Sequence, residues 1–123
     1  MSKFIIVGNP ETQVDLITEL IHNIHFPYPD NIEIEYSFQP VVSENNNIIY
    51  INISPSDLWD LMSNGNMSEE NRRKFNDYVV SFARYENYSN KTFKIIEHID
   101  LYNLAIDIWN YIRAENIAQE EIK

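Results

Sequence analysis

The spacing of apolar residues along the chain predicts four β-strands. The first is apolar at four consecutive positions, Phe4–Val7, which is typical of a strand buried on both faces. In the second, apolar residues alternate with Glu33, Glu35 and Ser37, so one face is expected to be buried and the other acidic. The third strand is again apolar on both sides. The four strands are expected at residues 4–7, 32–38, 48–53 and 92–99.

Helices are expected between these strands, and each follows a residue that can cap a helix. Asn9 followed by Pro10 is a strong start signal, because asparagine caps well and proline fits the first helical position. The helix that follows has apolar residues on one side and Glu11, Asp15 and Glu19 on the other. The helices are expected at about 10–25, 55–62, 69–85 and 101–119.

The order of these elements, β-α-β-β-α-α-β-α, predicts one α/β domain that spans residues 1–123. We expect a four-stranded mixed sheet with strand 4–7 in its centre and helices covering it. Asn45-Asn46-Asn47 has the composition of a turn. The strands before and after it are therefore expected to form an antiparallel hairpin.

The opening strand, turn and helix, followed by this expected hairpin, bear a topological resemblance to a known fold. Over residues 1–60 the chain resembles the start of a Ras-like P-loop domain, with Gly8 at the first glycine of the phosphate loop. Gln13, Val14 and Asp15 stand where a working loop has glycine, lysine and serine or threonine. The resemblance therefore implies at most a relic of that fold that binds no nucleotide.

The net charge of -10 falls on one part of the chain. Residues 1–71 contain eleven acids and one base, Lys3, whereas residues 72–123 contain eight of each. An anionic surface repels nucleic acid and anionic membranes and attracts a basic protein, although net charge also simply maintains solubility. The basic run Arg72-Arg73-Lys74 directly follows Glu69-Glu70, so ion pairs within one helix are expected rather than contacts to nucleic acid.

Composition excludes several classes of protein. The chain has no cysteine, which excludes disulfide scaffolds, thiol catalysis and cysteine-bound metals. No apolar run approaches the roughly 20 residues that cross a bilayer, and the N-terminus is too short for a signal peptide, so a cytoplasmic protein is expected. Isoleucine (19) and asparagine (16) are abundant, as AT-rich coding favours, which suggests a phage or another mobile element.

Two groups of polar residues were candidates for chemistry. Glu19, His22 and His25 have the spacing of ligands on one helical face, but no second motif completes a metal site. Glu33 and Glu35 point the same way from one strand, as paired catalytic carboxylates can, yet nothing near them in sequence supplies an oxyanion site. We therefore predict no enzymatic activity, no cofactor and no metal.

The last helix has an unusually wide apolar arc. Tyr102, Ile106 and Trp109 extend its inward stripe to roughly 220° of the helical wheel, wider than a surface helix needs. Either the helix is deeply buried, or these three side chains contact a partner or a second copy of the chain.

Two hypotheses from different classes follow. The first is a non-enzymatic inhibitor, an immunity or antidote protein, that neutralises a basic partner such as a nuclease toxin by electrostatic steering and tight docking. The second is a small structural or regulatory α/β module, such as the P-loop relic above, that acts as a homodimer or an assembly subunit through the last helix. The carboxylates expected to contact a basic partner are Glu11, Asp15, Glu19, Glu33, Glu35 and Glu44.

Overall fold

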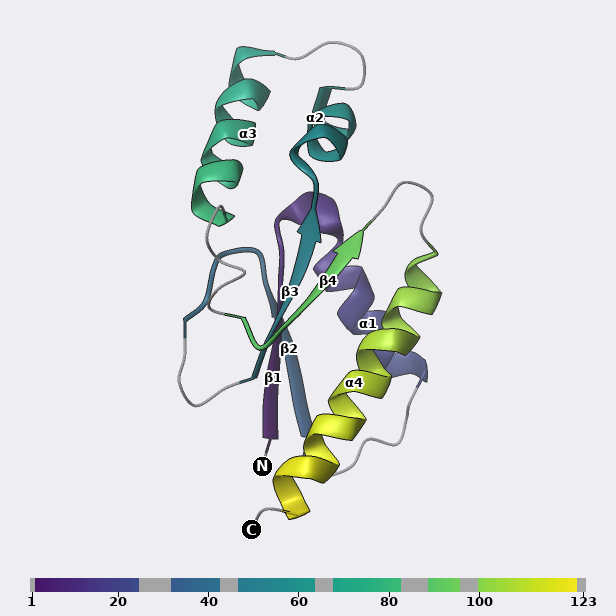
Figure 1. Ribbon diagram of the computed structural model, residues 1–123. Helices are drawn as coiled ribbons and strands as arrows, with labels where there is room; N and C mark the ends of the chain where they lie inside the picture. Colours follow the sequence, from purple (N-terminus) through teal and green to yellow (C-terminus); the bar gives the residue numbers. More distant parts are fainter. Residues whose placement is uncertain are drawn as a thin grey trace.

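The computed structural model describes residues 2–24, 32–42, 47–63, 68–82, 89–95 and 100–121, and confirms the α/β class (Figure 1). Each expected element is present in the expected order. In chain order the elements are β1 (Ser2–Val7), the 3-10 turn η1 (Pro10–Thr12), α1 (Val14–Ile24), β2 (Ile32–Ser37), β3 (Asn47–Ile53), α2 (Pro55–Ser63), α3 (Glu69–Phe82), β4 (Lys91–Ile95) and α4 (Leu101–Glu121).

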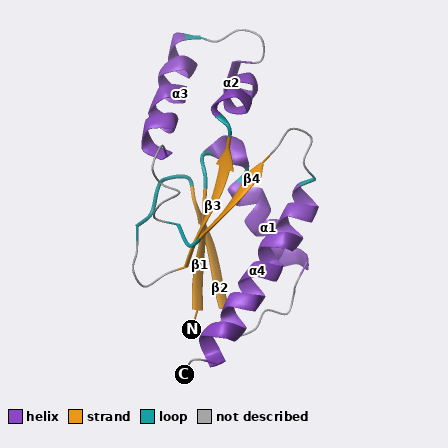
Figure 2. Cartoon of the chain, viewed as in Figure 1, coloured by secondary structure: helices purple, strands orange, loops and turns teal. Residues whose placement is uncertain are grey.

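The sheet is parallel throughout, with strand order β2-β1-β3-β4, so the expectation of a mixed sheet was wrong (Figure 2). The expected hairpin was also wrong, because β1 lies between β2 and β3. Ile5 pairs with Glu35 on one side and with Ile48 on the other. Asn45 and Asn46, the centre of the expected turn, lie outside the described residues, and Asn47 is the first residue of β3.

The strand order follows from which strands are apolar on both faces. β1 and β3 occupy the interior of the sheet, where residues on both sides are covered, whereas β2 alternates and takes an edge. Phe4 and Ile6 on one side of β1 are fully buried, and Ile5 and Val7 on the other side are at most 7% exposed. The continuous apolar runs therefore mark the interior strands.

The main core lies between the sheet and two helices, on what we call the helical face. α1 and α4 lie side by side there and contact β1, β2 and β3 with apolar side chains (Figure 1). Burial of this kind stabilises by roughly 25 cal/mol per Å² of apolar surface. The fully buried side chains of this core include Phe4, Ile6, Ile17, Ile21, Ile49, Ile108 and Ile112.

The opposite face of the sheet has a smaller core. Ile5, Val7, Ile48 and Tyr50 form its buried cluster, against which Val41 and Phe82 pack. The rings of Tyr50 and Phe82 stack with their centroids 5.6 Å apart and a 9° angle between their planes. The segment after β2 and the end of α3 thus contribute to covering this face.

The turn after β1 differs from the expected helix start. Residues 10–12 form a 3-10 turn, and Gln13 then adopts a left-handed conformation (φ 59°), so that α1 begins only at Val14. Asn9 stands at the expected capping position, but its side chain makes no capping hydrogen bond. Thr12 Oγ1 donates to the Asn9 carbonyl at 2.6 Å, which holds the turn together but caps no backbone N–H.

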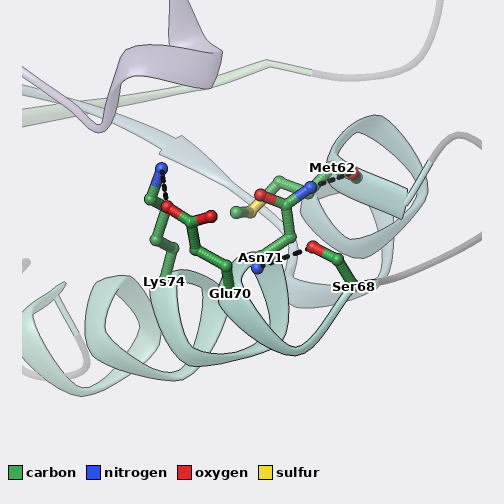
Figure 3. A network of polar contacts seen from close by, with 5 residues as sticks. All are labelled: Met62, Ser68, Glu70, Asn71 and Lys74. Atoms are coloured by element: carbon green, nitrogen blue, oxygen red, sulfur yellow. Dashed lines mark hydrogen bonds and ion pairs between the residues drawn. The ribbon is translucent and has the colours of Figure 1, made fainter.

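Helices α2 and α3 form a hairpin beyond the carboxyl ends of β1 and β3 (Figure 1). Asn71 joins the two helices, since its Nδ2 donates to the Met62 carbonyl at 3.3 Å while its backbone N–H donates to Ser68 Oγ at 3.1 Å (Figure 3). Trp59 and Phe75 meet edge to face at 5.0 Å. No residue of α3 is fully buried, so this helix attaches to the domain through half-buried side chains.

Candidate functional site

The acidic residues of the first helical segment form an exposed group. Asp15 and Glu19 are exposed on α1, on the side turned away from the core, and Glu11 is half-buried in η1. Neither Asp15 nor Glu19 has an ion-pair partner in the part of the chain that the structure describes. Their charge is therefore available to a partner molecule.

The glutamates of β2 lie on the other side of the sheet. Ile32 and Ile34 face the helical core, so Glu33 and Glu35, which alternate with them, are exposed on the opposite face. Glu35 lies 3.3 Å from Lys3 Nζ on the neighbouring strand, whereas Glu33 has no ion pair within the described residues.

The predicted carboxylates therefore form two groups separated by the edge of the sheet. α1 covers one side of β2, and Glu33 and Glu35 occupy the other. No described segment pairs with the outer edge of β2. Glu44, the remaining predicted residue, lies outside the described residues. A single flat surface does not hold all six, but a partner at the β2 edge would meet carboxylates on both sides.

The apolar residues of α4 divide between core and surface. Trp109 is 3% exposed and belongs to the main core, so burial accounts for it. Ile106 is half-buried and Tyr102 is 49% exposed. Only these two of the three predicted self-association residues are therefore accessible.

Tyr111, also on α4, packs edge to face on Phe93 with Lys91 Nζ 5.9 Å from its ring centre. Burial raises the pKa of the Tyr111 hydroxyl above its ordinary value of 10, and the nearby Glu115 carboxylate adds to the rise. The unfolded chain then releases this proton at lower pH than the folded one.

This difference makes stability depend on pH in the alkaline range. The contribution of the Tyr111 proton to the free energy of unfolding is fully present below pH 10, the ordinary pKa of a tyrosine. It is lost as the pH rises through the higher pKa of the folded state. We expect the free energy of unfolding to fall more steeply above pH 10 in the wild-type protein than in Tyr111→Phe, measured by urea unfolding at pH 8 to 11. If the free energy of unfolding fell equally with pH in both proteins, the raised pKa of Tyr111 would be contradicted.

The described residues show no arrangement for metal-dependent chemistry, because no three His, Asp or Glu side chains among them converge on one point.

In the basic run of α3, Lys74 pairs with Glu70 at 3.5 Å, the i, i+4 contact expected from the sequence (Figure 3). Arg72 and Arg73 are exposed. His22 is exposed on α1, and His25 and His98 lie outside the described residues.

A pocket of about 180 Å³ lies where β1 and β3 end and the α2–α3 hairpin begins. Of the described residues that line it, Asn9, Tyr50, Asn52 and Tyr78 are polar and none is charged. The Asn9-Pro10 pattern predicted only a helix cap, and no site was predicted here. Local patterns do not contain the strand order, and only adjacent, parallel β1 and β3 bring Asn9 and Asn52 together.

Comparison with protein-family models, with curated proteins and with solved structures finds no match to this chain. Within the described residues, no helix combines the length and the apolar character needed to cross a membrane.

Proposed function

We propose that this protein is a non-enzymatic protein-binding module, an acidic inhibitor or antidote that neutralises a basic protein. The observation that supports it most directly is the pair of carboxylate groups on the two sides of the β2 edge. Asp15, Glu19 and Glu33 are exposed and lack counter-ions within the described residues. Such unneutralised charge accelerates encounter with an oppositely charged partner.

The β2 edge itself offers a second element of recognition. An unpaired edge strand presents backbone N–H and C=O groups, and charged side chains such as Glu33 and Glu35 discourage pairing with copies of the same chain. The same charges favour a basic segment. A basic partner can thus combine backbone hydrogen bonds to β2 with ion pairs on both of its sides.

The alternative is a structural or regulatory module that forms a homodimer through α4. Its support is the exposure of Tyr102, next to the half-buried Ile106. Apolar contacts would hold such a dimer, so its association would persist at high salt, whereas binding at the acidic β2 edge would weaken. Sedimentation at increasing concentration and salt separates these two proposals.

Charge reversal at the β2 edge tests the first proposal. In affinity capture from a lysate of the source organism at about 50 mM salt, Glu33→Lys/Glu35→Lys should recover far less of the specific partner than the wild-type protein. With that partner purified, the association rate constant should fall by roughly tenfold or more and the rate should lose its salt dependence.

Asp77→Lys/Asp107→Lys provides the matched control, because both residues are exposed, lie away from β2 and change the net charge equally. It should retain the partner and most of the association rate. An equal loss in both double variants would show that overall charge alone is responsible. Unchanged capture by Glu33→Lys/Glu35→Lys would remove β2 from the interface.

A further inference from the structure

The pocket beside Asn9 has the position at which open parallel sheets bind ligands. In such sheets, ligands bind outside the carboxyl ends of the strands, where the chain changes direction across the sheet. Here the chain passes from β1 to β2 on one side and then to β3 on the other. The change of direction therefore lies between the ends of β1 and β3, next to the pocket.

Asn9 is the polar lining residue whose side chain has an unsatisfied hydrogen-bond acceptor. It is 5% exposed, and its Oδ1 is buried with no hydrogen-bond donor among the described residues. Its backbone is fixed, because its carbonyl accepts hydrogen bonds from the N–H of Thr12 at 3.0 Å and from Thr12 Oγ1 at 2.6 Å. A buried acceptor without a donor opposes folding, and the side chain makes no capping hydrogen bond that would offset this cost.

The remaining lining defines what the pocket accepts. Ile53 and Leu58 are at most 9% exposed, and Val79 and Phe82 of α3 form part of the opposite wall. Among the described lining residues none is charged, so they offer a charged ligand no counter-ion in return for its lost hydration. The volume of about 180 Å³ is below the roughly 300–1,000 Å³ typical of drug-sized sites, so the occupant is about the size of one ring.

We infer that this pocket binds a small, uncharged ring compound whose N–H group donates to Asn9 Oδ1. The apolar residues of β3, α2 and α3 enclose the ring of this ligand, and Asn9 sets its orientation. The inference is independent of the acidic β2 edge, since none of the pocket residues belongs to that surface.

Three probes of similar shape test the chemistry of the pocket. Benzamide is uncharged and has an N–H donor, benzoate is an anion, and ethylbenzene has no polar group. In a titration of the ¹⁵N-labelled protein, benzamide should shift the amide signals of Asn9, Asn52 and Tyr78 with a dissociation constant of roughly 1 mM. Benzoate and ethylbenzene should bind at least tenfold more weakly. Equal binding by either one, or no shift with benzamide, would overturn the inference.

Asn9→Leu separates a ligand-binding role from a structural one. The leucine has a similar size and no orphan acceptor, so the variant should unfold no more readily than the wild-type protein while its benzamide affinity falls at least tenfold. A loss of stability in Asn9→Leu with unchanged affinity would assign Asn9 to the fold instead.

A second pair of variants tests the position of the ligand. Val79→Phe should fill the pocket and abolish benzamide binding, whereas Val80→Phe should not, because Val80 is 76% exposed and does not line the pocket. Equal binding by both variants would place benzamide elsewhere and overturn the inference.

Discussion

Replacement of Trp109 by alanine is expected to destabilise the protein by about 3–5 kcal/mol. Trp109 is 3% exposed and packs in the main core beside Ile108 and Ile112, so its removal leaves a large cavity between α4 and the sheet. Unfolding in urea, followed by far-ultraviolet circular dichroism, measures the effect.

Tyr102→Ala is the matched control on the same helix. Because Tyr102 is 49% exposed, we expect its loss to change the free energy of unfolding by no more than about 0.5 kcal/mol. If Trp109→Ala were instead as stable as wild type and only the oligomeric state changed, Trp109 would be a surface anchor and its placement in the core would be wrong.

Gly8→Ala is expected to cost about 1–3 kcal/mol, although it adds only one methyl group. A Cβ at this position would lie 2.9 Å from Val14 Cγ1, 3.2 Å from the Ile51 carbonyl oxygen, and closer still to Thr12 Oγ1. Thr12 cannot move away easily, because its hydroxyl donates to the Asn9 carbonyl. The same urea unfolding experiment measures the cost.

A double-mutant cycle identifies the clash. Thr12→Ala removes the nearest atom, so Gly8→Ala should cost less by at least about 0.5 kcal/mol in the Thr12→Ala background than in wild type. Additive effects would mean that Val14 or the Ile51 backbone causes the strain.

The sequence predicted the four strands and the four α-helices from apolar runs, apolar periods and helix-start residues, but not the 3-10 turn η1. The alternation in 32–38 predicted a half-buried strand with an acidic outer face, and the apolar stripes of α1 and α4 predicted their inward sides. The boundary of the first helix was less accurate, because the left-handed Gln13 interrupts a pattern that is otherwise helical from residue 10.

The pairing of the strands was the main error, and the asparagine run caused it. Nine residues separate Ser37 from Asn47, and at roughly 3.3–3.6 Å each they can reach back along a six-residue strand of about 20 Å. A parallel connection was therefore open to the chain. The better evidence was the apolar character of Phe4–Val7 and 48–53 on both faces, which marks both as interior strands.

The candidate sites could be predicted only in part, because they too depend on how the strands and helices are arranged in space. The exposure of Asp15, Glu19, Glu33 and Glu35 follows from local periodicity, and the structure agrees with it. Their separation by the sheet depends on which face α1 covers, which no local pattern specifies. The environment of Asn9 depends on the proximity of α2 and α3 to the strand ends, which is a tertiary property.

The shallow attachment of α3 implies that the domain has two levels of stability. α4 and the interior strands can open only together with the core, whereas α3, without a buried residue, can detach by local unfolding at a smaller free-energy cost. Such an event would expose Tyr50 and the floor of the pocket while the sheet stays folded. The rate of this local unfolding would then limit how quickly the small molecule inferred above enters or leaves the pocket.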